Sequence, residues 1–133
     1  MLPLFSYLKS SEVLRKLKVS KLIPHNREKV FKEIADFENY VNFIPGCSKA
    51  KLIEKGNGFE IGLLEFDFLL RKYEIKSKNI LSNYQIDIEQ IEGPFETFNA
   101  CWKVNAKADD VTEATLSAEF EPVSYTHLTL PTS

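Results

Sequence analysis

The sequence predicts an α+β protein whose main element is an antiparallel β-sheet, preceded by two short helices. Two apolar stripes with helical spacing lie between residues 30 and 44. After Pro45-Gly46 the apolar residues recur with a period of two, and they do so as far as Phe120. Short turns separate these alternating segments, and consecutive strands that are joined in this way pair antiparallel.

The helical part follows one strand. Lys16 to Ile23 is predicted to be that strand, and Asn26 is a suitable N-cap for a helix that runs to about Asp36. A second helix is predicted from Phe37 to Ile44. Pro45-Gly46 ends it, because proline disfavours α geometry in the residue before it and glycine permits the chain to reverse.

About six strands are predicted in the remaining chain. Phe59–Phe68 has apolar residues in both parities, which indicates either a β-bulge or a strand that is buried on both sides. The other segments alternate more simply, with hairpin signals such as Gly56-Asn57-Gly58 between them. The predicted segments are Ser48–Glu54, Phe59–Phe68, Leu70–Ile80, Tyr84–Ile88, Phe95–Ala106 and a last strand through Phe120.

Composition is typical of one globular domain without strong attraction to polyanions. The chain has 133 residues, 44% of them hydrophobic, and a net charge of −2, so DNA is not an expected partner. Cys47 and Cys101 fit no metal-ligand spacing and are expected to be free thiols, with a disulfide as the alternative. A local basic set is expected to form a solvated outer sheet surface, with anionic lipid headgroups or RNA as alternative partners: Lys49, Lys51, Lys55, Arg71, Lys72, Lys76 and Lys78.

The two ends of the chain differ from the part between them. Residues 1–13 are expected to form an N-terminal arm, and residues 14–122 the folded domain. Val123 to Thr132, VSYTHLTLPT, resembles the translation of a transposase sequencing adaptor. Residues 123–133 are therefore expected to be an artefactual tail, which is excluded from fold reasoning.

The sequence contains no motif that is typical of a catalytic site. His25 lies in a connection and has no serine or cysteine that pattern pairs with it, and the scattered glycines form no phosphate-binding loop. Paired carboxylates such as Asp109-Asp110 lie in turns, where solvation explains them. We therefore expect no enzymatic activity, no metal and no catalytic residue. The remaining signal is a sheet face rich in aromatic residues, which either packs on a covering helix or holds an apolar ligand.

Three segments carry a family resemblance. SKLIP at Ser20–Pro24, IADFENYVNFIPGC at Ile34–Cys47 and EGPFETFNACWKV at Glu92–Val104 resemble the coenzyme Q-binding START-domain family. That family belongs to the polyketide cyclase/lipid transport (SRPBCC) superfamily, which also includes the ribosome association toxin. The resemblance covers about Leu14 to Glu121, and Gly46 departs from it where the family usually has an aromatic residue. It implies a helix-grip fold, an antiparallel sheet around a long C-terminal helix with an apolar tunnel; here that helix is expected to be missing.

The resemblance also implies a function. We expect non-enzymatic binding of ubiquinone in support of respiratory electron transport, with peripheral contact with a membrane and no other cofactor. The implied location is the matrix side of the mitochondrial inner membrane, with bacterial cytoplasm as the alternative. A ribosome-binding regulator and a polyketide cyclase-like enzyme are the alternative functions.

Pattern and resemblance together select the walls of the expected ligand site. Tyr73 or Trp102 could offer a hydrogen bond to a quinone oxygen. The expected ligand-binding residues are Phe43, Ile44, Pro45, Phe66, Phe68, Tyr73, Phe95, Phe98, Trp102 and Phe120.

Overall fold

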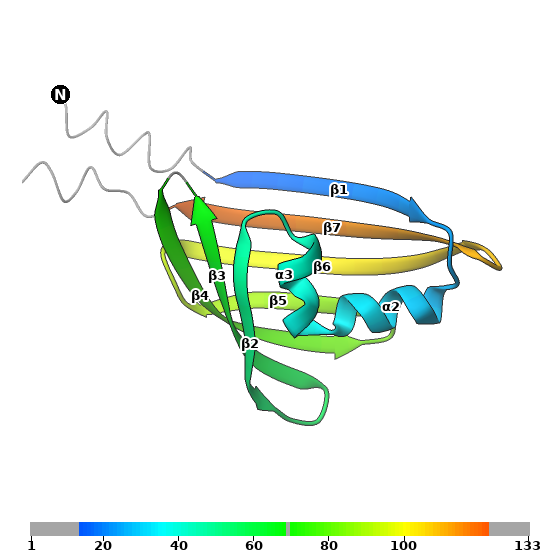
Figure 1. Cartoon of the computed structure of the whole chain (residues 1–133), viewed down its shortest axis with the longest axis horizontal. Helices are drawn as coiled ribbons and strands as arrows, with labels where there is room; N and C mark the ends of the chain where they lie inside the picture. The colour runs from blue at the N-terminus through cyan, green and yellow to red at the C-terminus, as the bar shows by residue number, and fades with distance from the viewer. Residues whose placement is uncertain (1–13, 69, 123–133) are drawn as a thin grey trace, which may run out of the picture.

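Seven antiparallel strands form a single curved sheet, with the helices on its concave side (Figure 1). The computed structural model describes residues 14–68 and 70–122, without the side chains of Phe68 and Pro122. The strand order is β1-β7-β6-β5-β4-β3-β2, which confirms the predicted antiparallel α+β class. The elements in chain order are β1 (Arg15–Ile23), α2 (Arg27–Ala35), the 3-10 helix η1 (Phe37–Asn39), α3 (Tyr40–Phe43), β2 (Cys47–Lys55), β3 (Phe59–Phe68), β4 (Arg71–Ser82), β5 (Gln85–Glu92), β6 (Phe95–Ala108) and β7 (Val111–Pro122).

The helices connect the two edges of the sheet. β1 and β2 are the edge strands, so the chain between them must cross from one edge to the other. It does so over the concave side, where α2 and α3 lie in front of the central strands in Figure 1. β1 then pairs with β7, the last strand, so that Val19 lies opposite Leu116.

An N-cap hydrogen bond stabilises the first turn of α2, and packing against the sheet stabilises the rest of the helix. The Asn26 side-chain oxygen accepts a hydrogen bond from the Lys29 backbone N–H at 2.9 Å, as predicted for an N-cap. Val30 and Ile34 point to the sheet and are buried in one core cluster. Their buried partners in that cluster, from β5, β6 and β7, are Ile86, Ile88, Ala100, Val104, Ala114 and Ala118.

The second predicted helix is divided into η1 and a single α turn, α3. Phe37 of η1 is buried and its ring lies against Gly62 of β3, where an added Cβ would come within 2.4 Å of the ring. The helix ends before Pro45-Gly46, as predicted, and Gly46 adopts a φ of +82° that favours glycine. This turn leads directly into β2.

Two details differ from the sequence-based expectation. The register shifts lie in β2, between Cys47 and Lys49 and between Leu52 and Glu54, whereas β3 pairs regularly with β4. Tyr84, predicted to begin a strand, has a φ of +56° and lies in the turn before β5. Its ring instead contacts α2, where the Arg27 guanidinium lies 3.9 Å from the ring centroid.

Several predictions concern segments outside the described residues. These are the N-terminal arm at 1–13, the adaptor-like tail at 123–133, and the C-terminal helix that was expected to be missing after the last strand. Within the described part, no helix combines the length and apolar character that crossing a membrane requires. Cys47 and Cys101 are both free, as expected.

Candidate functional site

The inner face of the sheet collects the aromatic residues that the sequence singles out. Strand register sets this, because residues directly opposite each other in an antiparallel pair point to the same face. Phe66 of β3 lies opposite Tyr73 of β4, and Phe98 of β6 lies opposite Phe120 of β7. Trp102 shares this face. We call the inner-face set Phe66, Tyr73, Phe95, Phe98, Trp102 and Phe120 the aromatic trough.

Three phenylalanines form one end of the trough. The Phe95 ring centroid lies 5.5 Å from that of Phe98 and 5.4 Å from that of Phe120, and the Phe98 and Phe120 rings stack at 6.1 Å. All three side chains are only partly buried. Aromatic pairs at these separations stabilise one another by about 0.5–1.5 kcal/mol beyond their burial. The cluster is therefore an ordered apolar surface that still has area to offer a ligand.

A second aromatic series joins the helices to the sheet. Phe37, Tyr40 and Phe43 contact one another in turn, with centroid distances of 5.1 Å and 5.4 Å, and Phe43 meets Trp102 edge-on at 6.4 Å. Tyr40 is buried and was not among the predicted site residues. The spacing of Tyr40 from Phe37 in the sequence indicates that both lie on one helix face. Spacing alone does not show that the Tyr40 hydroxyl lies near the Trp102 side chain.

Phe95 connects the two aromatic series. It also packs against the core cluster around Leu64 and Ile75 that Phe66 and Ile44 adjoin. Its position depends on Gln90 of β5, whose side-chain amide donates to the Phe95 carbonyl at 2.8 Å and accepts from the Phe95 N–H at 3.3 Å. Gln90 thus continues the pairing across the Gly93-Pro94 turn, where the β5–β6 ladder has ended.

The predicted residues of the turn after α3 form a rim beside the trough. Phe43, Ile44 and Pro45 line an open cleft of about 470 Å³ together with Asp67 and residues of the turn. Phe43 is 40% exposed and its neighbour Val41 is 39% exposed. The side chain of Phe68, the remaining predicted site residue, lies outside what the structure describes.

The β1 edge extends the apolar inner face beyond the predicted residues. Leu17 and Val19 share the inner face with their partners Ala118 and Leu116 on β7, yet they are 44% and 53% exposed. Figure 1 shows why, since α2 and α3 lie below β1 and β7 and leave this part of the concave side uncovered. The sequence predicted this strand but not which of its residues face inward.

Burial favours the uncharged state of two polar groups near the trough, a hydroxyl and a thiol. Burial raises the pKa of the Tyr40 hydroxyl above its ordinary value, and a hydrogen bond from the Trp102 side chain partly opposes this rise. Burial likewise raises the pKa of the Cys47 thiol. At the edge of the trough, the Arg71 guanidinium lies 5.8 Å from the centroid of the Tyr73 ring. The trough therefore offers an apolar surface with a neutral hydroxyl and a neutral thiol nearby and one charged group, Arg71, at its edge.

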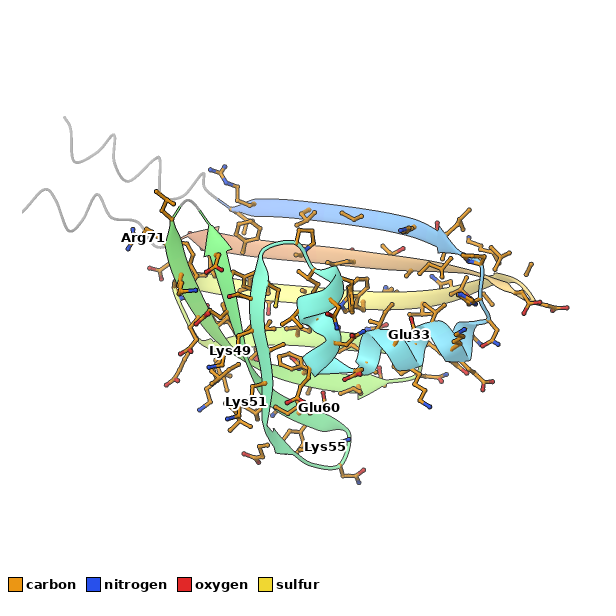
Figure 2. All side chains as sticks on the ribbon, in the orientation of Figure 1. Glu33, Lys49, Lys51, Lys55, Glu60 and Arg71 are labelled. Atoms are coloured by element: carbon orange, nitrogen blue, oxygen red, sulfur yellow. The ribbon has the colours of Figure 1, made fainter. Side chains whose placement is uncertain are left out.

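The outer face carries most of the predicted basic residues. Lys51 and Lys76 flank Leu63 across three strands, and Figure 2 shows Lys49 and Lys51 on the side of β2 away from the helices. Among the described residues, Lys49, Lys51, Lys76 and Lys78 take part in no ion pair, whereas Lys72 pairs with Asp67 at 2.9 Å.

Two basic residues do not join this outer face. The second register shift in β2 brings Lys55 to the inner side, opposite Glu60. Arg71 turns to the Tyr73 ring instead.

These features define the class of fold: a seven-stranded antiparallel sheet curved over short helices is a START-like, helix-grip arrangement. The chain belongs to the polyketide cyclase/dehydrase and lipid transport family, whose sequence model matches residues 23–129. The match extends past Pro122, so the assignment of residues 123–133 to an adaptor stays a prediction.

Relatives of known name have different roles. The chain is 29% identical over 89 residues to the ribosome association toxin RatA of Rickettsia prowazekii, covering 63% of this chain and 61% of that protein. It therefore spans about three fifths of that relative's length. Among solved structures, the Zhui aromatase/cyclase from Streptomyces sp. R1128 superposes with a TM-score of 0.77 at 19% identity, covering 83% of this chain and 69% of that one. A START superfamily protein from Mycobacterium smegmatis gives 0.74 at 13% identity, covering 81% and 77%.

Proposed function

We propose that this protein binds and carries a polyisoprenoid quinone, ubiquinone, on the aromatic trough and catalyses no reaction. The observations that support this most are two groups of aromatic contacts on the concave side of the sheet: Phe43 with Trp102, and the Phe95–Phe98–Phe120 cluster. Removing an isoprenoid chain from water stabilises a complex by about 25 cal/mol per Å² of buried apolar surface, so few polar contacts are needed. The family's description, which includes lipid transport, is in keeping with this role.

The quinone head requires a polar partner at one end of the trough. Tyr73 suits this role because its hydroxyl belongs to a partly buried inner-face residue beside Arg71. Trp102 is the weaker choice, since its side chain already lies against Phe43 and near the Tyr40 hydroxyl. The exposed Val41 and Phe43 on the rim suit brief contact with a bilayer during loading and release.

Reconstitution with ubiquinone tests the proposal directly. Trp102 is the only tryptophan of the chain, so a bound quinone should quench its fluorescence. Phe66→Asp should lower the amount of quinone retained, because it places a charge on the apolar surface. Ile53→Asp, on an exposed residue of β2, is the matched control and should retain quinone. Protein that stays empty after reconstitution would contradict the proposal.

Ribosome binding is the second candidate function. The name of the Rickettsia relative and the unpaired outer-face lysines Lys49, Lys51, Lys76 and Lys78 both favour it. Binding through these lysines should weaken steeply with salt, since each phosphate contact releases counterions. Co-sedimentation with purified ribosomal subunits between 50 and about 200 mM salt would measure this. A cyclase-type enzyme is the third candidate, and its support comes from the name of the family and from the Zhui aromatase/cyclase among the structural neighbours.

The proposed location follows the proposed partner. Support of respiratory electron transport would place the protein beside a quinone-containing membrane, and the mitochondrial inner membrane was the first expectation. The Rickettsia relative is bacterial, which favours the alternative of the bacterial cytoplasm. Fractionation of cells that express the full gene would decide between membrane-associated and free protein.

A further inference from the structure

The two edge strands of the sheet differ in regularity. β2 carries two register shifts, and irregularities of this kind interrupt the row of backbone groups along an edge. β1 pairs with β7 without a register shift over all nine of its residues. Along the edge of β1 that faces away from β7, every second residue therefore points its N–H and C=O groups outward in an unbroken row. Of the two edges, this one is the better template for a further strand.

The free edge of β1 is also accessible. Every residue from Arg15 to Leu22 is exposed, and β7 is the only described strand that pairs with β1. Figure 1 shows β1 at the top of the sheet, whereas α2 and α3 lie below it in front of the central strands. β1 contains no proline, which would remove a donor from the edge. An extended peptide that pairs with β1 would thus continue the sheet, a mode of recognition known as β-strand addition.

β1 carries a concentrated positive charge. It contains Arg15, Lys16, Lys18 and Lys21 and no acidic residue. Among the described residues, only Lys16 of these four reaches a carboxylate, that of Glu119 at 3.7 Å, and both of those side chains are largely exposed. Lysines on an edge strand oppose pairing with a strand of the same charge, whereas a strand with carboxylates opposite them is stabilised. The charge of β1 therefore selects an acidic partner.

The two faces of β1 favour different residues in that partner. On the inner face Leu17 and Val19 are 44% and 53% exposed, so apolar side chains opposite them would bury surface on both strands. On the outer face Lys16 and Lys18 favour carboxylates, and Lys21 favours another near the far end of the strand. The complementary sequence is therefore one in which acidic and apolar residues alternate.

We propose that the free edge of β1 binds an extended acidic segment of a partner protein, which adds to the sheet as an eighth strand. The segment places carboxylates opposite Lys16, Lys18 and Lys21 and apolar residues opposite Leu17 and Val19. A second copy of this chain is a poorer occupant, because pairing two β1 strands would bring the four cationic side chains of each together. The surface lies outside the residues proposed to hold ubiquinone, and the proposal does not depend on quinone binding.

The probe is the seven-residue peptide VETVEVE with both ends blocked, written to pair antiparallel with β1 from Leu22 to Lys16. The full chain is titrated with it while the backbone amide NMR signals are recorded. The signals of β1 should shift in a saturable way. VKTVKVK, with lysine for each glutamate, and EEETVVV, with the same composition but no alternation, should each bind about tenfold more weakly. Equal binding of EEETVVV would mean that charge alone attracts the peptide and would overturn the proposal.

Hydrogen exchange separates strand addition from side-chain attraction. One alternate set of β1 amides bonds to β7, and the other set points outward and should exchange quickly in the free protein. With VETVEVE at ten times its Kd, the outward set should exchange about tenfold more slowly, because exchange then proceeds from the small free fraction. Binding without this added protection would contradict strand addition. Protection that rises with protein concentration in the absence of peptide would assign the edge to a second copy and also overturn the proposal.

A matched pair of variants tests the charge on the two edges of the sheet. Lys18→Glu should lower the affinity for VETVEVE about fivefold and raise the affinity for VKTVKVK. Lys51→Glu makes the same change on an exposed residue of β2, the opposite edge, and should leave both affinities unchanged. An unchanged affinity in Lys18→Glu, with a native amide spectrum, would overturn the proposal, as would an equal loss in Lys51→Glu. Ubiquinone retention should be the same in both variants, so failure of the carrier proposal would show separately.

Discussion

At the scale of single residues, Gly62 decides how closely η1 can approach the sheet. A Cβ at this position would lie 2.4 Å from the buried Phe37 ring. Gly62→Ala should therefore lower the free energy of unfolding by about 1–3 kcal/mol, as overpacking of a core does. Urea denaturation measures the change. In a Phe37→Leu background the same substitution should cost less, and equal costs in both backgrounds would show that the ring contact is not the cause.

Glu60 gives a pH-dependent prediction of stability. Because burial raises its pKa, the folded protein binds the proton more tightly than the unfolded chain, whose value lies near 4.3. The free energy of unfolding contributed by this group therefore falls as the pH rises through the range between those two values. Glu60→Gln should raise the stability at pH 7, and the gain should shrink at pH 4, where the unfolded chain also binds the proton. Urea denaturation at both pH values checks this; an equal gain at both would assign it to packing.

At the scale of elements, the β5–β6 connection depends on one side chain. Gln90 makes two hydrogen bonds to the backbone of Phe95, which anchors the aromatic end of the trough. Gln90→Ala should cost about 1–2 kcal/mol and speed hydrogen exchange at Phe95. Gln85→Ala is the control, since among the described residues the Gln85 side chain hydrogen-bonds the exposed Asp87 on the same strand and no residue of the Phe95 cluster. Unchanged exchange at Phe95 in Gln90→Ala would contradict this account.

The elements themselves were largely predictable, because periodicity reports which face of a segment is buried. The succession of strand, helices and six strands along the chain, the N-cap at Asn26 and the Pro45-Gly46 stop all follow from local patterns and are found in the structure. The register shifts were not predictable. Apolar residues at both odd and even positions of β3 suggest a bulge, but they do not reveal that the extra residues lie in its partner strand β2. Tyr84 was misplaced because an aromatic residue before Ile86 continues an alternating pattern even when its φ is positive.

The candidate site was predictable in its residue types but not in its contacts. Alternation placed Phe98, Trp102 and Phe120 on one face, and register confirms that they share it. Alternation could not show that Tyr40 reaches Trp102 or that Glu60 is largely covered, because both depend on how helices and distant strands meet. Whether the trough residues bind ubiquinone stays a prediction.

At the scale of the whole molecule, the sheet keeps two surfaces apart. Its inner face carries the aromatic trough, while Lys51 and Lys76 lie on the outer face on either side of Leu63. Because side chains alternate between faces along every strand, a substitution on one face leaves the other face intact. The two candidate functions can therefore be tested in one set of variants.

The decisive comparison pairs Trp102→Ala with the double variant Lys51→Glu/Lys76→Glu. Trp102→Ala should weaken ubiquinone binding about tenfold, because it removes a large apolar side chain from the trough, and should leave ribosome co-sedimentation unchanged. The lysine double variant should retain quinone. If the ribosome binds the outer face, this variant should lower the slope of log affinity against log salt by roughly 2, one for each phosphate that is no longer neutralised. Either variant could instead lose both ubiquinone binding and ribosome binding while its amide spectrum stays native. That result would contradict the assignment of the two functions to separate faces of the sheet.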